Sequence, residues 1–140
     1  MSPNTRKFFK ICIMVFFSVI IFPEIYIPVE EMSEIVDSLV VAQSWGNDVR
    51  IVLFVVLNKG IVLDDELISK IKTTIRSDAT TRHVPSRILQ IHDVPRTISG
   101  KKVEKAVLQT IRGESVENIS ALANPESLSI FADLREKLKK

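Results

Sequence analysis

Two adjacent lysines, Lys101 and Lys102, follow a short polar turn and have the clearest chemical potential in this sequence. The turn contains Thr97, Ser99 and Gly100, whose hydroxyls and backbone freedom favour a tight loop. A lysine at this junction, between a predicted strand and a predicted helix start, is exposed and firmly mounted. The segment therefore predicts a cation that can reach an anion held by another part of a protein.

The Gly100–Lys101 pair does not belong to a phosphate-binding P-loop. That loop requires a glycine five residues before the Gly-Lys pair and Ser or Thr directly after the lysine. Pro95 and Lys102 occupy those two positions here. Since the backbone cradle is missing, Lys101 would act as a mobile point charge.

The composition indicates one folded domain without disulfides or a metal site. The chain has 140 residues, of which 46% are hydrophobic and 26% charged, so it has enough apolar residues for one core. Its only cysteine, Cys12, excludes a disulfide framework and a cysteine metal cage. His83 and His92 are nine residues apart, a poor spacing for zinc, and we expect both to be structural.

Residues 1–23 differ in character from residues 24–140, which we expect to form the domain. The first segment has three basic residues and no acidic one, and it is uncharged from residue 11 to 22. The apolar stretch 8–22 resembles a signal peptide or anchor. It is, however, shorter than the ~18–20 residues that span a bilayer, and no small-residue cleavage site follows. Two interpretations stay open: an anchor, or a terminus foreign to a soluble domain.

The rest of the chain alternates between helical and strand patterns. Pro28 suits a first helical turn, with Val29, Met32 and Val36 on one face. Runs rich in β-branched residues at 38–44 and 50–57 predict two strands joined by a turn, the second buried on both faces.

The second half continues the alternation and indicates an α+β fold, a small mixed sheet flanked by helices. We expect a loop over residues 113–124, and packing roles for Tyr26 and Trp45. The further expected elements are a helix starting at Asp64–Glu66, a strand from Ile88 up to Pro95, a helix from Gly100 to a stop at Gly113, and a last helix with Asn124 as N-cap and Pro125 at its first position.

The stretch VPRTISGKKVE, residues 94–104, resembles the closing lysine motif of the adenylate-forming enzymes, which include acyl-CoA synthetases, peptide-synthetase adenylation domains and luciferases. The wider context is similar to the acetoacetyl-CoA synthetases within that superfamily, over roughly residues 24–132. The segments that carry this resemblance, in order, are EIY at 24–26, VE at 29–30, RHVP at 82–85, the lysine motif through Val107, and NPE at 124–126 with Leu128.

The resemblance implies a two-step ligation: ATP and acetoacetate form an acyl-adenylate, and the thiol of coenzyme A then displaces AMP. It implies the C-terminal domain of an enzyme whose large N-terminal adenylation domain holds most of the ATP site, with Mg²⁺, and the carboxylate pocket. We therefore expect this chain to be inactive alone. The resemblance also implies a cytosolic location, with membrane anchoring through residues 8–22 as the alternative.

The motif match assigns Lys101 as the catalytic lysine, with Lys102 facing solvent or a phosphate edge. Thr97, Ser99 and Gly100 are further candidates for binding substrate or cofactor. Gly100 would permit the turn, and Thr97 and Ser99 would hold it by local hydrogen bonds. Two arginines could bind the nucleotide phosphates of coenzyme A, although ordinary solvated charge is an equal alternative for both. These two are Arg76 and Arg82.

Two other functions compete with this interpretation. The domain could belong to another acyl-CoA synthetase, because the specificity pocket lies in the N-terminal domain. It could also be a non-catalytic module whose basic residues bind nucleic acid or an acidic partner. Residues 24–140 carry 16 basic and 17 acidic residues and few aromatics, so we expect no nucleic acid. The basic set is Arg82, Arg87, Arg96, Lys101, Lys102 and Lys105.

Overall fold

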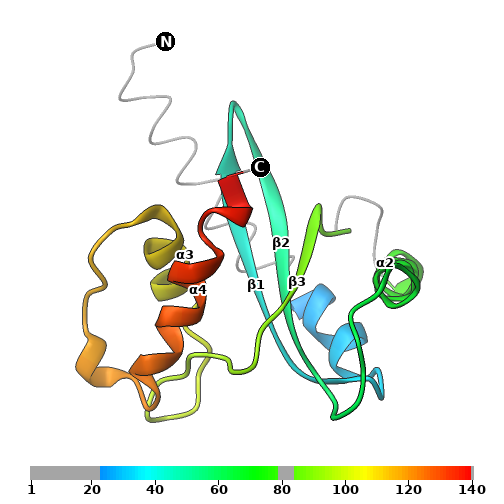
Figure 1. Ribbon diagram of the computed structural model, residues 1–140, viewed down its shortest axis with the longest axis horizontal. Helices are drawn as coiled ribbons and strands as arrows, with labels where there is room; N and C mark the ends of the chain where they lie inside the picture. The colour runs from blue at the N-terminus through cyan, green and yellow to red at the C-terminus, as the bar shows by residue number, and fades with distance from the viewer. Residues whose placement is uncertain (1–22, 79–83, 140) are drawn as a thin grey trace.

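A computed structural model describes residues 23–78 and 84–139 of the chain. Its centre is a three-stranded sheet in the order β1-β2-β3. Strand β1 (Ile35–Trp45) pairs antiparallel with β2 (Asp48–Leu57), and β2 pairs parallel with β3 (Arg87–Gln90). Helices cover both faces of this sheet, with α2 on one side and α3 and α4 on the other (Figure 1). The predicted α+β architecture with a small mixed sheet is confirmed.

The β1–β2 hairpin forms where the β-branched runs predicted it. Gly46 takes a φ of 62° in the connecting turn, a conformation that glycine adopts without steric cost. Residues 51–55 of β2 are all buried, although their side chains alternate between the two faces of the sheet. The prediction of a strand buried on both faces is therefore correct, and it explains why each face needs its own helical layer.

One layer consists of a helix at residues 23–30 and α2 (Asp65–Asp78). The side chain of Asp64 accepts a hydrogen bond from the Leu67 amide at 2.8 Å, which caps α2 as the acidic start predicted. The predicted stripe of α2 packs on the sheet, with Leu67, Ile71 and Ile75 buried. This layer forms one hydrophobic core with Ile25, Val29 and alternate residues of β1 and β2.

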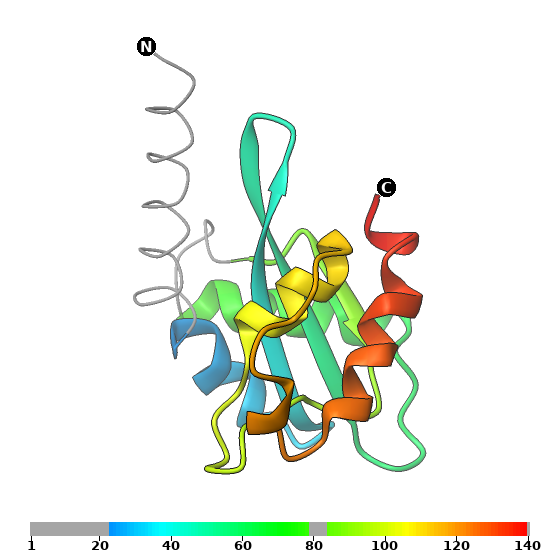
Figure 2. The ribbon, with the colours of Figure 1, turned by 90° about the vertical axis from the view of Figure 1, so that its left-hand side faces the viewer.

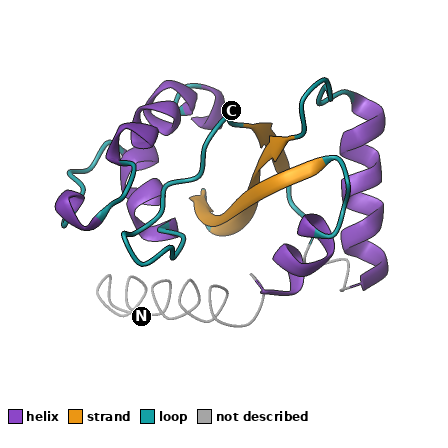
Figure 3. Cartoon of the chain, turned by 90° about the horizontal axis from the view of Figure 1, so that it is seen from below, coloured by secondary structure: helices purple, strands orange, loops and turns teal. Residues whose placement is uncertain are grey.

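The opposite layer consists of α3 (Glu104–Arg112) and α4 (Leu128–Leu134). Figure 3 shows the sheet between the two helical layers. Gly113 ends α3 with a φ of 77°, as predicted. The buried rings of Phe54 and Phe131 meet edge to face, 4.9 Å between centroids. Three short 3₁₀ helices complete the layer: η2 (Ile119–Ala121), η3 (Pro125–Ser127) and η4 (Lys137–Lys139).

The predicted first helix is wrong in its boundaries. The helical residues are 23–30, so Pro28 lies inside the helix and not in its first turn as expected. The buried pair Ile25 and Val29, one turn apart, explains this position, because burying both requires a helix that starts before Pro28. Val36 is not on the helix; it is the extra residue at a register shift in β1, and it is exposed.

Two further boundaries and one helix cap differ from the prediction. β3 ends at Gln90 and does not reach Pro95, and α3 starts at Glu104 and not directly after Gly100. Asn124 precedes η3 as expected, yet its side chain makes no cap hydrogen bond. It donates instead to Asp93 Oδ2 at 2.8 Å and to the Val94 carbonyl at 3.0 Å, so residues 93–94 after β3 bond to this side chain.

Within residues 23–78 and 84–139, no helix is long and apolar enough to cross a membrane. The apolar segment 1–22, Arg82 and His83 lie outside the described residues, so the structure does not bear on their predicted roles. His92 is exposed. Trp45 is also partly exposed, and the guanidinium of Arg50 lies 3.7 Å from its ring centroid, so it packs against a side chain at the sheet edge and not in a core.

Candidate active site around the lysine turn

Residues 96–102, here called the lysine turn, form a small closed loop. Arg96 and Lys102 make an antiparallel bridge at its base, and the Thr97 amide donates to the Lys101 carbonyl at 2.8 Å. The Gly100 amide donates to the Thr97 carbonyl at 2.8 Å. Gly100 has a φ of 89°, a left-handed conformation that costs a residue with a Cβ about 1–2 kcal/mol.

Hydroxyl groups stiffen the loop from inside, as the sequence predicted. The hydroxyls of Thr97 and Ser99 are 2.9 Å apart, and the Lys101 amide donates to Thr97 Oγ1 at 3.1 Å. Lys101 itself is exposed and has no ion pair within the described part of the chain. The turn therefore holds the backbone of Lys101 in place and leaves its charge available.

Lys102 has the opposite environment, and the expectation that it faces solvent or a phosphate is wrong. Its side chain is 15% exposed, and its ammonium forms an ion pair with Glu30. The same nitrogen lies 3.7 Å from Asp37 Oδ1 and 3.7 Å from the ring centroid of Tyr26. Lys101, one residue earlier, is outside the bridge and exposed, so the two neighbouring lysines have different environments.

Arg96 ties the turn to the start of β1. Its Nη2 donates to both carboxylate oxygens of Asp37, at 2.8 and 2.7 Å, and its Nη1 donates to the Gly100 carbonyl at 3.0 Å. One guanidinium thus joins the tip of the turn to a strand far away in sequence. Such charge-assisted bonds are stronger than neutral ones.

Tyr26 lies on the buried side of the ion pairs formed by Lys102 and Arg96. Its hydroxyl donates to Glu104 Oε1 at 2.9 Å and accepts from the Val40 amide at 2.9 Å. Burial, followed by the negative charge of Glu104, raises the pKa of Tyr26 above its ordinary value. Tyr26 therefore does more than the packing expected of it, since it joins the helix at 23–30, β1 and the first turn of α3.

Tyr26 is the only tyrosine of the chain, which makes its ionisation directly measurable. Because the folded-state pKa is raised, we expect a stabilising contribution that is complete below about pH 10 and is lost as the pH rises further. In a spectrophotometric titration, tyrosinate absorbance should stay low at about pH 11, where a solvated tyrosine is mostly ionised. Ordinary titration near pH 10 in a chain that remains folded would contradict this, and Tyr26→Phe provides the blank.

The segment 113–124, predicted as a loop over the body, runs beside the lysine turn. The Ile98 amide donates to the Ala121 carbonyl at 3.0 Å, and Thr97 and Leu122 form a second antiparallel bridge. The side-chain oxygen of Asn124 accepts from the Arg96 amide at 2.9 Å. In Figure 2 the yellow-green turn lies below α3, next to the segment that leads to α4.

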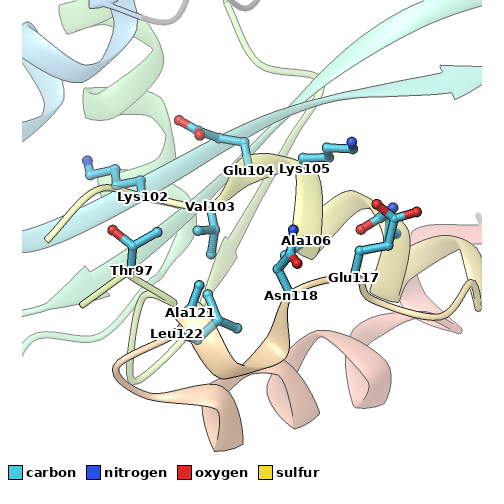
Figure 4. A pocket seen from close by; sticks show the side chains of 11 residues that line it. Thr97, Lys102, Val103, Glu104, Lys105, Ala106, Glu117, Asn118, Ala121 and Leu122 are labelled. Carbon is cyan, nitrogen blue, oxygen red and sulfur yellow. The ribbon is translucent and has the colours of Figure 1, made fainter. Parts of the chain in front are cut away.

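A groove of about 360 Å³ lies between the turn, α3 and η2. Thr97 and Lys102 stand on one side of it, and Glu117 and Asn118 on the other (Figure 4). Near it, Ile98 is 76% and Ile119 49% exposed. The lysine turn therefore carries an exposed cation, Lys101, and an exposed apolar side chain, Ile98.

Of the other predicted basic residues, Arg96 and Lys102 belong to the turn and Lys105 lines the groove, whereas Arg76 lies elsewhere. Arg76 is exposed on α2, which covers the opposite face of the sheet from α3 (Figure 1). Arg96 and Lys102 are ion-paired, and Arg87 donates to the Lys137 carbonyl at 3.1 Å. Internal partners thus occupy three members of the basic set proposed as a nucleic-acid or partner patch.

The sequence analysis missed the acidic side of the site. Glu30, Asp37 and Glu104 approach the turn from the helix at 23–30, from β1 and from α3. Two signals were available: Arg96 within the lysine motif, and an acid at the start of a strongly β-branched run. Neither signal says which acid meets which base. Within the described residues, no group of three or more His, Cys, Asp or Glu side chains could hold a metal ion.

Comparison with known proteins finds several that are similar to this chain. No protein-family model matches the chain. The chain is 50% identical over 113 residues to an acetoacetyl-coenzyme A synthetase of Rhizobium meliloti, and 44% identical over 114 residues to an acetoacetyl-CoA synthetase of Rattus norvegicus. Each match covers 81% of this chain and 17% of the relative, so the chain spans about a sixth of the length of these relatives.

A solved structure gives the same result for the fold. The acetoacetyl-CoA synthetase from Streptomyces lividans matches 82% of this chain with a TM-score of 0.74 and 33% sequence identity, using 18% of its own length. The matched part is the C-terminal domain of that structure. The described residues of this chain therefore correspond to the C-terminal domain of the acetoacetyl-CoA synthetases.

Proposed function

We propose that residues 24–140 form the C-terminal domain of an acetoacetate–CoA ligase and supply Lys101 to adenylate formation. One observation carries this proposal. The lysine turn holds two neighbouring lysines in opposite states, with Lys102 tied to Glu30 and Asp37 and Lys101 exposed on a stiff loop. A turn with a purely structural role needs only the ion-paired Lys102. A lysine that meets an anion on another domain must be exposed, as Lys101 is.

The chemistry explains why a lysine belongs at this point. In the first step, the carboxylate of acetoacetate attacks the α-phosphorus of ATP, and pyrophosphate leaves with the electrons of the broken P–O bond. Both reactants are anionic, so negative charge concentrates where they meet. An ammonium group brought into a closed, water-poor site stabilises that charge far better than one in water. In the second step, the thiol of coenzyme A displaces AMP from the acyl-adenylate.

Most binding functions would lie outside this domain. Its described residues contain no acid cluster suited to Mg²⁺, so we assign the magnesium nucleotide and the acid pocket to a large N-terminal adenylation domain. The names of the relatives support acetoacetate as the acid. Arg76 lies on the face opposite to α3, so it would reach coenzyme A only in a different orientation of the domain. We also propose a cytosolic location.

Activity assays on two proteins test this proposal. The purified chain, given acetoacetate, ATP and coenzyme A, should release no AMP. A fusion in which residues 24–140 replace the matched segment of the Rhizobium meliloti relative should release AMP with acetoacetate present. Clear turnover by the chain alone would contradict the assignment of the acid pocket to another domain. An inactive but folded fusion would contradict the proposed function.

A further inference from the structure

Asp37 stands where the sheet and the lysine turn meet. The pairing of β1 with β2 shifts register between Ile35 and Asp37, which inserts Val36 as an extra residue. A bulge of this kind bends a strand and redirects the following side chain. The Ser38 amide donates to Asp37 Oδ1 at 2.9 Å, so the redirected carboxylate is itself held in place.

The charges around Asp37 are arranged in pairs. Arg96 donates to both Asp37 oxygens, and Lys102 lies 3.7 Å from one of them while it pairs with Glu30. Glu30 in turn accepts from the buried Ser38 hydroxyl at 3.0 Å. Two cations are thus opposed by two carboxylates.

Arg96 transmits the position of Asp37 to the tip of the turn. Its second nitrogen donates to the Gly100 carbonyl, which directly precedes Lys101 in the chain. Loss of the carboxylate would release the guanidinium from β1 and would leave two cations close together at the base of the turn. Both effects would disturb the Lys101 backbone and add competing positive charge.

From this geometry, and resting on the proposed function, we propose that Asp37 is a positioning residue for Lys101. It acts through Arg96, and it does not touch the substrates. A partly exposed ion pair contributes little to stability. Displacement of a reacting group by about 1 Å can cost about 10²-fold in rate. A positioning role therefore predicts a rate effect that is much larger than the stability effect.

The first arm of the test uses the full chain and does not depend on activity. Asp37→Asn keeps the shape of the side chain and removes its charge. We expect the Gly100 and Lys101 amides to exchange with deuterium about tenfold faster, while the amides at 51–55 of β2 stay unchanged and report an intact fold. The matched control is Glu34→Gln, which neutralises another acid paired with a lysine, Lys70, but does not contact the turn.

The second arm uses the fusion with the Rhizobium meliloti relative. Asp37→Asn should lower kcat for acyl-adenylate formation about 10–100-fold and leave the KM for ATP and for acetoacetate within about twofold. Asp37→Glu should restore part of kcat because it returns the charge. Glu34→Gln should behave as the unmodified fusion does.

The outcomes separate this inference from the proposed function. Turn exchange and kcat both within about twofold of the unmodified protein would overturn the positioning role, as would faster exchange with an unchanged kcat. If the unmodified fusion is inactive, or Lys101→Ala has no effect on it, the proposed function fails. In that case the exchange rates of the turn amides still test whether Asp37 orders the turn. Unchanged exchange in Asp37→Asn would refute this ordering, and faster exchange would support it.

Discussion

Replacement of Lys101 by alanine in the fusion is expected to slow acyl-adenylate formation by about 10²–10³-fold. This is the usual cost of removing one preorganised group that stabilises charge in the transition state. The lysine turn makes the change specific, because its hydrogen bonds involve the backbone of Lys101 and not the side chain. The rate should be measured as ATP-dependent formation of acetoacetyl-adenylate with release of pyrophosphate, separately from the thioester step.

The second half-reaction distinguishes a catalytic role from a general defect. Supplied with acetoacetyl-adenylate and coenzyme A, the Lys101→Ala fusion should form the thioester at close to the unmodified rate. An equal loss in both half-reactions would argue against the assigned role. Lys59→Ala serves as the matched control, since it removes an exposed lysine from the loop between β2 and α2 and should change neither step.

Phe131→Ala is expected to lower the free energy of unfolding by about 3–5 kcal/mol. Phe131 has no exposed surface, and its ring packs edge to face on Phe54 of β2. Truncation would remove that contact and leave a cavity between α4 and the sheet, because a short helix held at both ends cannot collapse to fill it. Urea unfolding of the full chain measures the loss.

This substitution tests whether α4 is an integral part of the domain. Val62→Ala is the control, because Val62 is 71% exposed and its truncation should cost less than about 0.5 kcal/mol. A loss below about 1 kcal/mol for Phe131→Ala would mean that α4 is dispensable. The segment that supports the lysine turn from the side would then have no firm attachment through α4.

Much of the fold was predictable because its signals are local. The apolar run of β2, the acidic start of α2 and the glycine stop of α3 each depend on neighbouring residues, and each prediction is correct. The errors lie where distant contacts compete with local preference. β3 stops at Gln90, and the predicted strand residues Asp93 and Val94 instead bond to the side chain of Asn124.

The candidate site divides in the same way. Residue order alone determined the lysine turn, because Gly100 and the hydroxyls of Thr97 and Ser99 act within a few residues of one another. Composition likewise predicted one core-forming domain after the apolar start. These properties depend on short-range sterics and hydrogen bonding, which involve residues that are close together in the sequence.

Only the tertiary structure decided which of two adjacent lysines is available. Lys102 is neutralised by Glu30, which is 72 residues away, and Arg96 by Asp37, which is 59 residues away. Those partners reach the turn because the helix at 23–30 and β1 pack beside it, and β1 does so with a bulge. The energy of an ion pair depends on distance and burial, and neither quantity exists until the chain has folded.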